Sequence, residues 1–280
     1  MPFAALRHYL GCMKTLLSIG HGFSGRATEA ALGPDWQVLG TSRSPGAAIL
    51  WPDQAAEALA QATHIVSWVP PGAGDPIAPV VADLPTPRLE WIGYASATSL
   101  YGDAGGAWID EDAPDQPDTT RGHSRFAAEE AWRSIAAERG VPLCILRIAG
   151  IYGPGRSNFD ALRDGRAQRV MKPGQVFNRI HVADLGRITA AAAEKRLSGT
   201  LIASDDEPAP NAEVIAHAAR LLGITPPPEI PYEQAELTPM ARSFWADNKR
   251  LRSRRRAELG LDLLYPTYRE GLQAILDVES

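Results

Sequence analysis

The sequence has little cysteine, no excess of positive charge and no long apolar run, and each shortage excludes a class of protein. Its two cysteines, Cys12 and Cys144, are far apart and lack metal-ligand spacing, so we expect no metal site, no disulfide framework and a cytoplasmic protein. A formal net charge of −5 argues against a nucleic-acid partner. No apolar run approaches the roughly 18 residues that a membrane span needs. We therefore expect the partner to be a small-molecule substrate, whose identity the sequence does not give.

Hydrophobic residues make up 45% of the 280 residues, so the chain can bury a large core. Residues 1–12 lack the apolar segment and cleavage site of a signal peptide, and we predict that they form a disordered extension. From Met13 onward, apolar runs alternate with helical patterns. The predicted strands are 15–19, 37–40, 64–69, 89–95 and 143–148, and the predicted helices are 25–32, 54–61, 77–84 and 124–139.

Strands and helices that alternate at this spacing predict an α/β fold, a Rossmann-type doubly wound parallel sheet. The second half is richer in proline and predicts a small C-terminal substrate lobe with helices at 212–222 and 268–277. We therefore predict a dinucleotide-binding domain at 13–150 and a smaller lobe at 151–280, with part of 176–203 returning to the Rossmann core.

A glycine-rich turn follows the first predicted strand. Its sequence, GHGFSG, fits the G-x-G-x-x-G pattern, whose glycines allow a tight turn and close approach of the backbone to a pyrophosphate at a helix N-terminus. A plain structural turn is the alternative. The predicted cofactor contacts in this turn are Gly20, His21, Gly22, Phe23, Ser24 and Gly25.

The end of the second predicted strand indicates which dinucleotide is bound. An NAD site usually has an acidic residue there for the ribose hydroxyls, but this chain has GTSRS at 40–44. Ser42 can donate a hydrogen bond, and Arg43 can pair with a 2′-phosphate through its planar guanidinium. The alternative is a surface arginine in a polar loop. We favour NADP over NAD.

Several ordered motifs resemble the extended short-chain dehydrogenase/reductase superfamily. They are YASATSLYGD at 94–103, LCILRIAGIYGPG at 143–155 and FNRIHVADL at 177–185. SDDEPAP at 204–210 and YPTYREGL at 265–272 resemble the narrower YeeZ-like subgroup of the NAD(P)-dependent epimerase/dehydratase family. The resemblance implies a nicotinamide cofactor, oxidoreductase or epimerase-like chemistry, and pairing into a homodimer. It places further cofactor contacts at Val69, Pro70, Pro71, Ala95, Ser96, Arg125 and Ile151.

The chain departs from the family at the Ser-Tyr-Lys residues that the resemblance implies. When the family's Tyr-x-x-x-Lys helix is aligned on Glu129, Arg125 falls at the lysine position and Arg121 at the tyrosine position. Arginine cannot act as a base near neutrality, because its pKa lies above about 12. The position of the family's serine or threonine is Ala97, flanked by Ser96 and Thr98.

These replacements leave alternatives open. Arg125 could bind ribose hydroxyls and Arg121 an anionic substrate, or both could belong to a solvated ladder of i,i+4 pairs with Glu129 and Arg133. Tyr101 or Thr98 could supply a proton, although Tyr101 could also only shape its loop. We therefore predict an NADP-binding oxidoreductase or epimerase-like protein without the usual Ser-Tyr-Lys set. The alternative is a non-catalytic NADP-binding redox sensor or regulatory protein.

Overall fold

The computed structural model describes residues 13–44 and 49–279. The predicted disordered extension at 1–12 lies outside these residues. The described chain forms two compact units. The first comprises residues 13–97, 123–147 and 185–201, and the second comprises residues 98–122, 148–184 and 202–279. The chain thus passes between the units several times, and residues 98–122, which lie inside the first predicted domain, belong to the second unit.

A seven-stranded sheet forms the centre of the first unit, in the order β11-β7-β5-β4-β1-β2-β3. The pairs β1–β2, β1–β4, β4–β5 and β2–β3 run parallel, which confirms the predicted Rossmann-type α/β fold. The strands are β1 (Lys14–Ile19), β2 (Trp36–Ser42), β3 (Ile49–Leu50), β4 (His64–Ser67), β5 (Trp91–Ala97), β7 (Leu143–Ile148) and β11 (Gly199–Ala203).

Strand β1 has β2 on one side and β4 on the other, so the order of the strands reverses there. In open α/β sheets, ligands bind beyond the carboxyl ends of the strands at such a switch point. The glycine turn directly follows β1, so the fold puts this turn where a dinucleotide site is expected.

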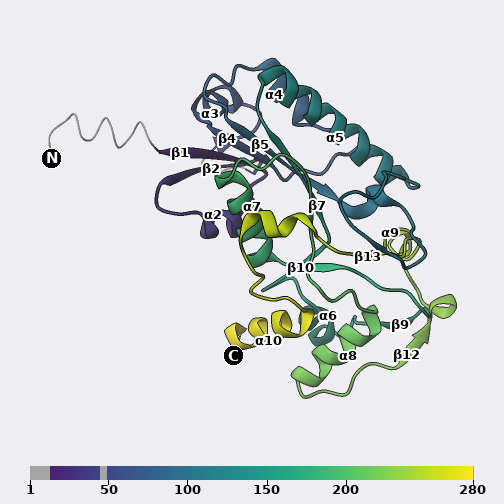
Figure 1. The fold of residues 1–280 in the computed structure, drawn as a ribbon. Helices are drawn as coiled ribbons and strands as arrows, with labels where there is room; N and C mark the ends of the chain where they lie inside the picture. Colours follow the sequence, from purple (N-terminus) through teal and green to yellow (C-terminus); the bar gives the residue numbers. More distant parts are fainter. Residues whose placement is uncertain (1–12, 45–48, 280) are drawn as a thin grey trace. The chain divides into compact units, whose positions relative to one another are not determined.

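Helices cover both faces of this sheet (Figure 1). Figure 1 shows α3, α4 and α5 on one face and α2 and α7 on the other. Their bounds are α2 (Phe23–Ala31), α3 (Ala55–Gln61), α4 (Ala78–Asp83), α5 (Thr120–Arg139) and α7 (Val182–Glu194). On the α5 face, Trp132 is fully buried and stacks on Tyr94 with ring centroids 5.7 Å apart. Trp132 is therefore a core residue of the first unit.

Gly186 of α7 allows a close approach to α2, which predicts an effect of substitution. A Cβ atom at Gly186 would lie 2.3 Å from the main-chain oxygen of Ala27. Gly186→Ala should therefore lower the free energy of unfolding by about 2–3 kcal/mol, because the backbone of one helix must move. Chemical denaturation measures this change. Gly72→Ala is the control, because a Cβ atom there would meet no atom within 4 Å, so this substitution should lower the free energy of unfolding less. Gly140→Ala is not a suitable control, because Gly140 has a positive φ. An equal loss of unfolding free energy in the two variants would contradict the explanation by close helix packing.

The second unit consists of short helices and two-stranded pairs. The pairs are β8 with β10, β9 with β12 and β6 with β13. The strands are β6 (Trp108–Ile109), β8 (Gly150–Tyr152), β9 (Arg169–Met171), β10 (Arg179–His181), β12 (Glu229–Pro231) and β13 (Arg250–Leu251). The helices are η1 (Thr98–Tyr101), α6 (Asn158–Arg163), α8 (Asn211–Leu221), η2 (Tyr232–Gln234), α9 (Pro239–Ser243), η3 (Arg255–Leu259) and α10 (Tyr268–Glu279).

Three of these helices bury the main apolar cluster of the second unit. Phe159 of α6, Ile215 of α8 and Leu272 of α10 pack in one core together with Tyr152 of β8. A Cβ atom on Gly271 would lie 2.0 Å from the Tyr152 hydroxyl oxygen, so a larger residue at this position would force the Tyr152 side chain or α10 to shift. The predicted helices at 212–222 and 268–277 agree closely with α8 and α10.

Candidate functional site

The glycine turn between β1 and α2 has the geometry of a phosphate cradle. Gly20 has a φ of +75°, and a Cβ atom there would lie 2.8 Å from Cγ2 of Val69. Gly22 stands at the N-cap of α2, where a Cβ atom would meet no atom closer than 3.8 Å. Among the described residues, no side chain caps this helix, and its first turn contains no acidic residue. The turn therefore leaves room for an anion at a positive helix end.

Two neighbours hold the turn in this conformation. The main-chain N–H of Gly20 donates to Oγ1 of Thr41, at 3.2 Å, and the N–H of His21 donates to the Thr41 carbonyl oxygen, at 2.9 Å. Thr41 lies in β2 and is buried. The end of β2 thus fixes the turn after β1, so the two predicted parts of the cofactor site are physically connected.

The His21 side chain has a structural role in the turn. Its Nδ1 lies 3.0 Å from Oγ of Ser18, and its Nε2 lies 3.1 Å from a carboxylate oxygen of Glu29. The ring occupies space that Gly40 leaves open, since a Cβ there would lie 2.7 Å from the ring. A cofactor contact of His21 would therefore have to come from its backbone.

The loop after β2 contains the residues that were predicted to distinguish NADP from NAD. Arg43 is exposed, and Ser42 is half-buried and accepts a hydrogen bond from the main chain of Ser44, at 3.1 Å. After β4, the WVPP segment places Val69 against Gly20. Pro71 is half-buried and Pro70 is exposed. The structure thus brings Val69 to the glycine turn.

Arg125 is buried rather than part of a solvated ladder, so that interpretation of Arg125 is wrong. Only 8% of the residue is exposed. Its Nη1 donates to the carbonyl oxygen of Ala95, at 2.6 Å, and lies 3.5 Å from the hydroxyl of Tyr94. Burial raises the pKa of Tyr94 to about 12. This tyrosine therefore stays protonated near neutrality and does not serve as a base.

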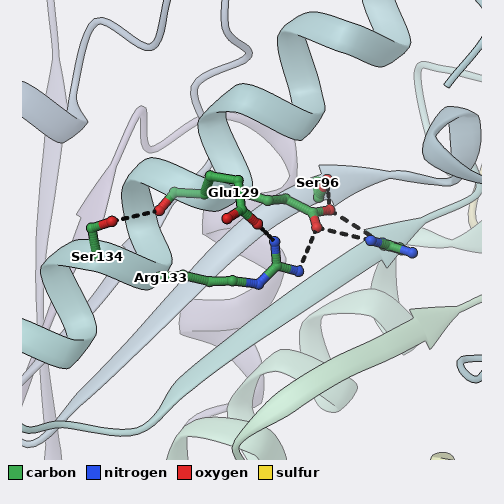
Figure 2. A network of polar contacts seen from close by, with 6 residues as sticks. Ser96, Glu129, Arg133 and Ser134 are labelled. Carbon is green, nitrogen blue, oxygen red and sulfur yellow. Dashed lines mark hydrogen bonds and ion pairs between the residues drawn. The ribbon is translucent and has the colours of Figure 1, made fainter. Parts of the chain in front are cut away.

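Glu129 is the centre of a buried ionic network (Figure 2). It is fully buried and accepts a 2.6 Å hydrogen bond from the Ser96 hydroxyl. Arg147 donates to both of its carboxylate oxygens, at 3.2 and 2.9 Å, and Arg133 donates at 2.9 Å. Figure 2 shows Ser96 and Arg133 directed toward the same carboxylate. Ser96 was predicted as a cofactor contact, and its hydroxyl links β5 to α5 through Glu129.

The remaining predicted residues lie in the second unit. Tyr101 is 3% exposed and packs with Ala149, Ile202 and Leu251 in a small apolar cluster. This burial supports a loop-shaping role, and proton donation by Tyr101 stays a prediction. Thr98 is half-buried at the start of η1. The predicted contact Ile151 is half-buried in β8 and pairs with Ile180 of β10.

Arg121 lies at the start of α5 and is exposed. Its guanidinium carbon lies 5.0 Å from the centre of the Phe244 ring, a cation–π contact within the second unit. Phe244 was not among the predicted site residues. No local pattern connects residues this far apart, so only the tertiary structure reveals the contact.

The second unit also contains a buried acid that sequence reasoning missed. Asp205 is 2% exposed, and burial raises its pKa to about 8 despite the nearby Arg179 guanidinium. Arg179 is also buried and donates to the carbonyl oxygens of Phe177 and Ala209, at 2.8 and 3.3 Å. A low effective dielectric surrounds these groups, so ionisation of Asp205 is costly in the folded chain.

Comparisons with solved structures support the fold over nearly the whole chain. A conserved protein of unknown function from Silicibacter pomeroyi is 40% identical, with a TM-score of 0.87 over 95% of this chain and 99% of its own. A human epimerase family protein solved with NADPH is 20% identical, with a TM-score of 0.77 over 94% and 99% of the two chains. The chain is a Rossmann-type α/β protein.

Sequence comparisons find a family model and curated relatives that are similar to part of the chain. The model of the NAD dependent epimerase/dehydratase family matches residues 88–200. A 3-diazoavenalumate denitrifying reductase from a Streptomyces species is 34% identical over 179 residues, and protein YeeZ of Escherichia coli is 33% identical over 146 residues. The alignments cover 59% and 50% of this chain but only 58% and 49% of those relatives. These matches show that residues 88–200 resemble the NAD dependent epimerase/dehydratase family and that about half of the chain is similar to protein YeeZ. None of the helices in the described residues is long and apolar enough to cross a membrane.

Proposed function

We propose that this protein is an NADP-dependent reductase that works without the Ser-Tyr-Lys set of the family that it resembles. The observation that carries the proposal is the glycine turn at the switch point, next to a β2 end that presents Arg43 in place of an acid. The human family member solved with NADPH supports a nicotinamide cofactor. The Streptomyces relative, named as a reductase, supports the reaction class.

The residues present fit this cofactor. The turn from Gly20 to Gly25 would hold the pyrophosphate at the N-terminus of α2, since an added Cβ at Gly22 would meet no atom closer than 3.8 Å. Arg43 would pair with the 2′-phosphate. Arg125, fixed by the Ala95 carbonyl oxygen, would contact ribose hydroxyls. When bound, a reduced nicotinamide supplies a hydride equivalent.

The absence of a suitable acid–base residue at the family's tyrosine position restricts the substrate. Arg121 keeps its proton near neutrality, and Tyr94 is fully buried with a pKa of about 12. A substrate that needs no proton from the protein fits this arrangement. The diazo group in the Streptomyces relative's substrate name is an example, because replacing a diazonium group by hydride releases dinitrogen without consuming a proton.

Arg43→Ala should weaken NADPH binding by about 10- to 100-fold and leave NADH binding within about twofold, because the lost contact is a charge-assisted pair with the phosphate. Calorimetric titration with both dinucleotides measures the change. Arg88→Ala is the matched control, since Arg88 is also exposed in the first unit but precedes β5 at the amino end of the strands. Unchanged discrimination in Arg43→Ala would contradict the assigned role.

Single-turnover oxidation of NADPH, followed at 340 nm, tests the reaction itself. The panel contains simple aldehydes and ketones together with aryl diazonium salts, each at matched concentration. We expect protein-dependent oxidation with the diazonium salts and little with the carbonyl compounds. NADPH binding without oxidation by any acceptor would contradict the reductase proposal and favour the non-catalytic redox sensor.

A further inference from the structure

We propose that helix α10 detaches locally from the rest of the second unit when the buried carboxyl group of Asp205 ionises, so that the position of this helix responds to pH. The inference goes beyond the proposed reductase activity, because it describes a conformational change inside the second unit alone. We call the arrangement in the structure the closed form, and the arrangement with α10 detached the open form.

Asp205 is a buried acid whose charge has no adequate partner. The residue is 2% exposed, and neither carboxylate oxygen has a hydrogen-bond partner in the part of the chain that the structure describes. The Arg179 guanidinium acts on the carboxyl group electrostatically, but its Nη1 donates to the carbonyl oxygens of Phe177 and Ala209. A buried carboxylate without donors is costly, whereas the protonated group is neutral. The closed form therefore favours protonated Asp205.

The segment that carries Asp205 is attached to the start of α10. The main-chain N–H of Asp206 donates to the Pro266 carbonyl oxygen, at 2.8 Å, two residues before the helix. In the first turn of α10, Arg269 pairs with Glu207 at 3.0 Å. The two residues after Asp205 thus both bind the beginning of α10, so a change at Asp205 acts directly on the seat of this helix.

Buried polar groups of α10 and β8 meet in the same region. Tyr268 of α10 is 1% exposed, and the Arg179 guanidinium carbon lies 5.9 Å from its ring centre. Gly271, in the next turn of α10, faces the Tyr152 hydroxyl. Among residues 13–44 and 49–279, neither tyrosine hydroxyl has a hydrogen-bond partner. Detachment of α10 would let water bind these hydroxyls as well as the Asp205 carboxylate, which lowers the cost of the open form.

The other titratable side chains of this region do not produce a rise in opening between pH 6 and 8. Burial raises the pKa of Tyr152 and of Tyr268 above their usual value, so both stay protonated. Burial lowers the pKa of His181 to about 4 and also lowers that of His217. A histidine with a lowered pKa makes opening fall, not rise, with increasing pH. The remaining charged groups on the surrounding elements are Asp184 of α7, Glu213 and Arg220 of α8, Arg256 of η3, Arg269 and Glu270 of α10, and Asp206 and Glu207 beside Asp205.

The direction and size of the response follow from Asp205. Burial raises its pKa from 3.8 to about 8, although Arg179 and the main-chain N–H of Glu207 act in the opposite direction. In the open form water solvates the carboxyl group, and its pKa returns toward the ordinary value. Between these two values the closed form holds a proton that the open form releases, so opening increases by up to about tenfold per pH unit. The increase ends above about pH 8, where both forms are ionised.

Hydrogen–deuterium exchange of the full chain at pH 6 and pH 7.5 tests the inference, with each rate divided by the intrinsic rate of an unprotected amide at that pH. We expect the protection of the α10 amides in wild type to fall by at least about tenfold over this interval, since the upper limit is roughly 30-fold. The buried strand β4 reports unfolding of the whole chain. Its amides should stay at least about tenfold better protected than those of α10 at both pH values.

Two substitutions at neighbouring acids separate the roles. Asp205→Asn should abolish the fall, so that the protection of α10 at the two pH values agrees within about twofold, because an amide does not ionise. Asp206→Asn is the matched control and should retain the fall, since the Asp206 carboxylate is half-exposed and pairs with Arg256. Circular dichroism of the same samples shows whether each variant is folded.

A smaller fall in wild type, or a fall that persists in folded Asp205→Asn, would overturn the inference. Equal protection of α10 and β4 would also overturn it, because the opening would then be unfolding of the whole chain. Wild type alone gives a further test if Asp205→Asn does not fold. Its α10 protection should change by less than about twofold between pH 8.5 and pH 9.5, and a continued steep fall would contradict control by Asp205.

Discussion

Glu129→Ala is expected to lower the free energy of unfolding by about 3–5 kcal/mol, the cost of breaking a buried ion pair by removing one partner. Glu129 is fully buried, and Arg147 is only 2% exposed. Without the carboxylate, Arg147 keeps a buried charge, and the Ser96 hydroxyl loses its acceptor. Denaturation in urea or guanidinium chloride, with the slope compared between variants, measures the loss.

The neighbouring Glu130 is the control for this prediction. Its side chain is 55% exposed and pairs with Arg133 at 2.5 Å, so Glu130→Ala should cost less than about 1 kcal/mol. Adding Arg147→Met to Glu129→Ala should recover part of the loss, because the second change removes the buried positive charge. Similar effects of Glu129→Ala and Glu130→Ala would refute the buried network.

The second large effect is a loss of stability with rising pH that originates at Asp205. Its carboxyl group has an ordinary pKa of 3.8, raised to about 8 in the folded chain, chiefly by burial. Between these two pH values the folded chain holds a proton that the unfolded chain releases, so folding stability falls as pH rises. Its contribution is fully present below pH 3.8 and is lost as pH rises through about 8.

Asp205→Asn should abolish this dependence, because an amide does not ionise. The variant should be more stable than wild type at pH 8.5 by on the order of several kcal/mol, since each pKa unit corresponds to about 1.4 kcal/mol, and the difference should shrink at pH 5. Unfolding curves at both pH values measure it. Asp206→Asn is the control, since the Asp206 side chain is 51% exposed and paired with Arg256. A pH dependence that persists in Asp205→Asn would contradict the assignment.

The first unit could be predicted well because its information is local. The strands β1, β2, β4, β5 and β7 differ from the predicted ranges by only a few residues at their ends, since each is a short apolar run bounded by turn residues. The glycine turn was identified by its position between strand and helix. The place of residues 98–122 in the second unit was not predicted, because single-sequence periodicity does not report which distant segments pack together.

The face of α5 shows where local reasoning fails. The i,i+4 spacing of Arg121, Arg125, Glu129 and Arg133 is the same for a solvated ladder and for a buried network. The residue that distinguishes the solvated ladder from the buried network lies in another segment. It is Arg147, the one charged residue in the apolar strand LCILRI. A charged residue in a buried strand requires a buried partner, and this rule applied to Arg147 would have indicated a buried acidic residue.

The central claim is that the glycine turn and the end of β2 bind NADP. The most direct test is calorimetric titration of the purified wild-type chain with NADPH and NADH in parallel, at the same ionic strength. The account predicts that NADPH binds at least about tenfold more tightly, or about 1.4 kcal/mol in binding free energy. Equal affinity for the two, or no binding of either, would contradict it.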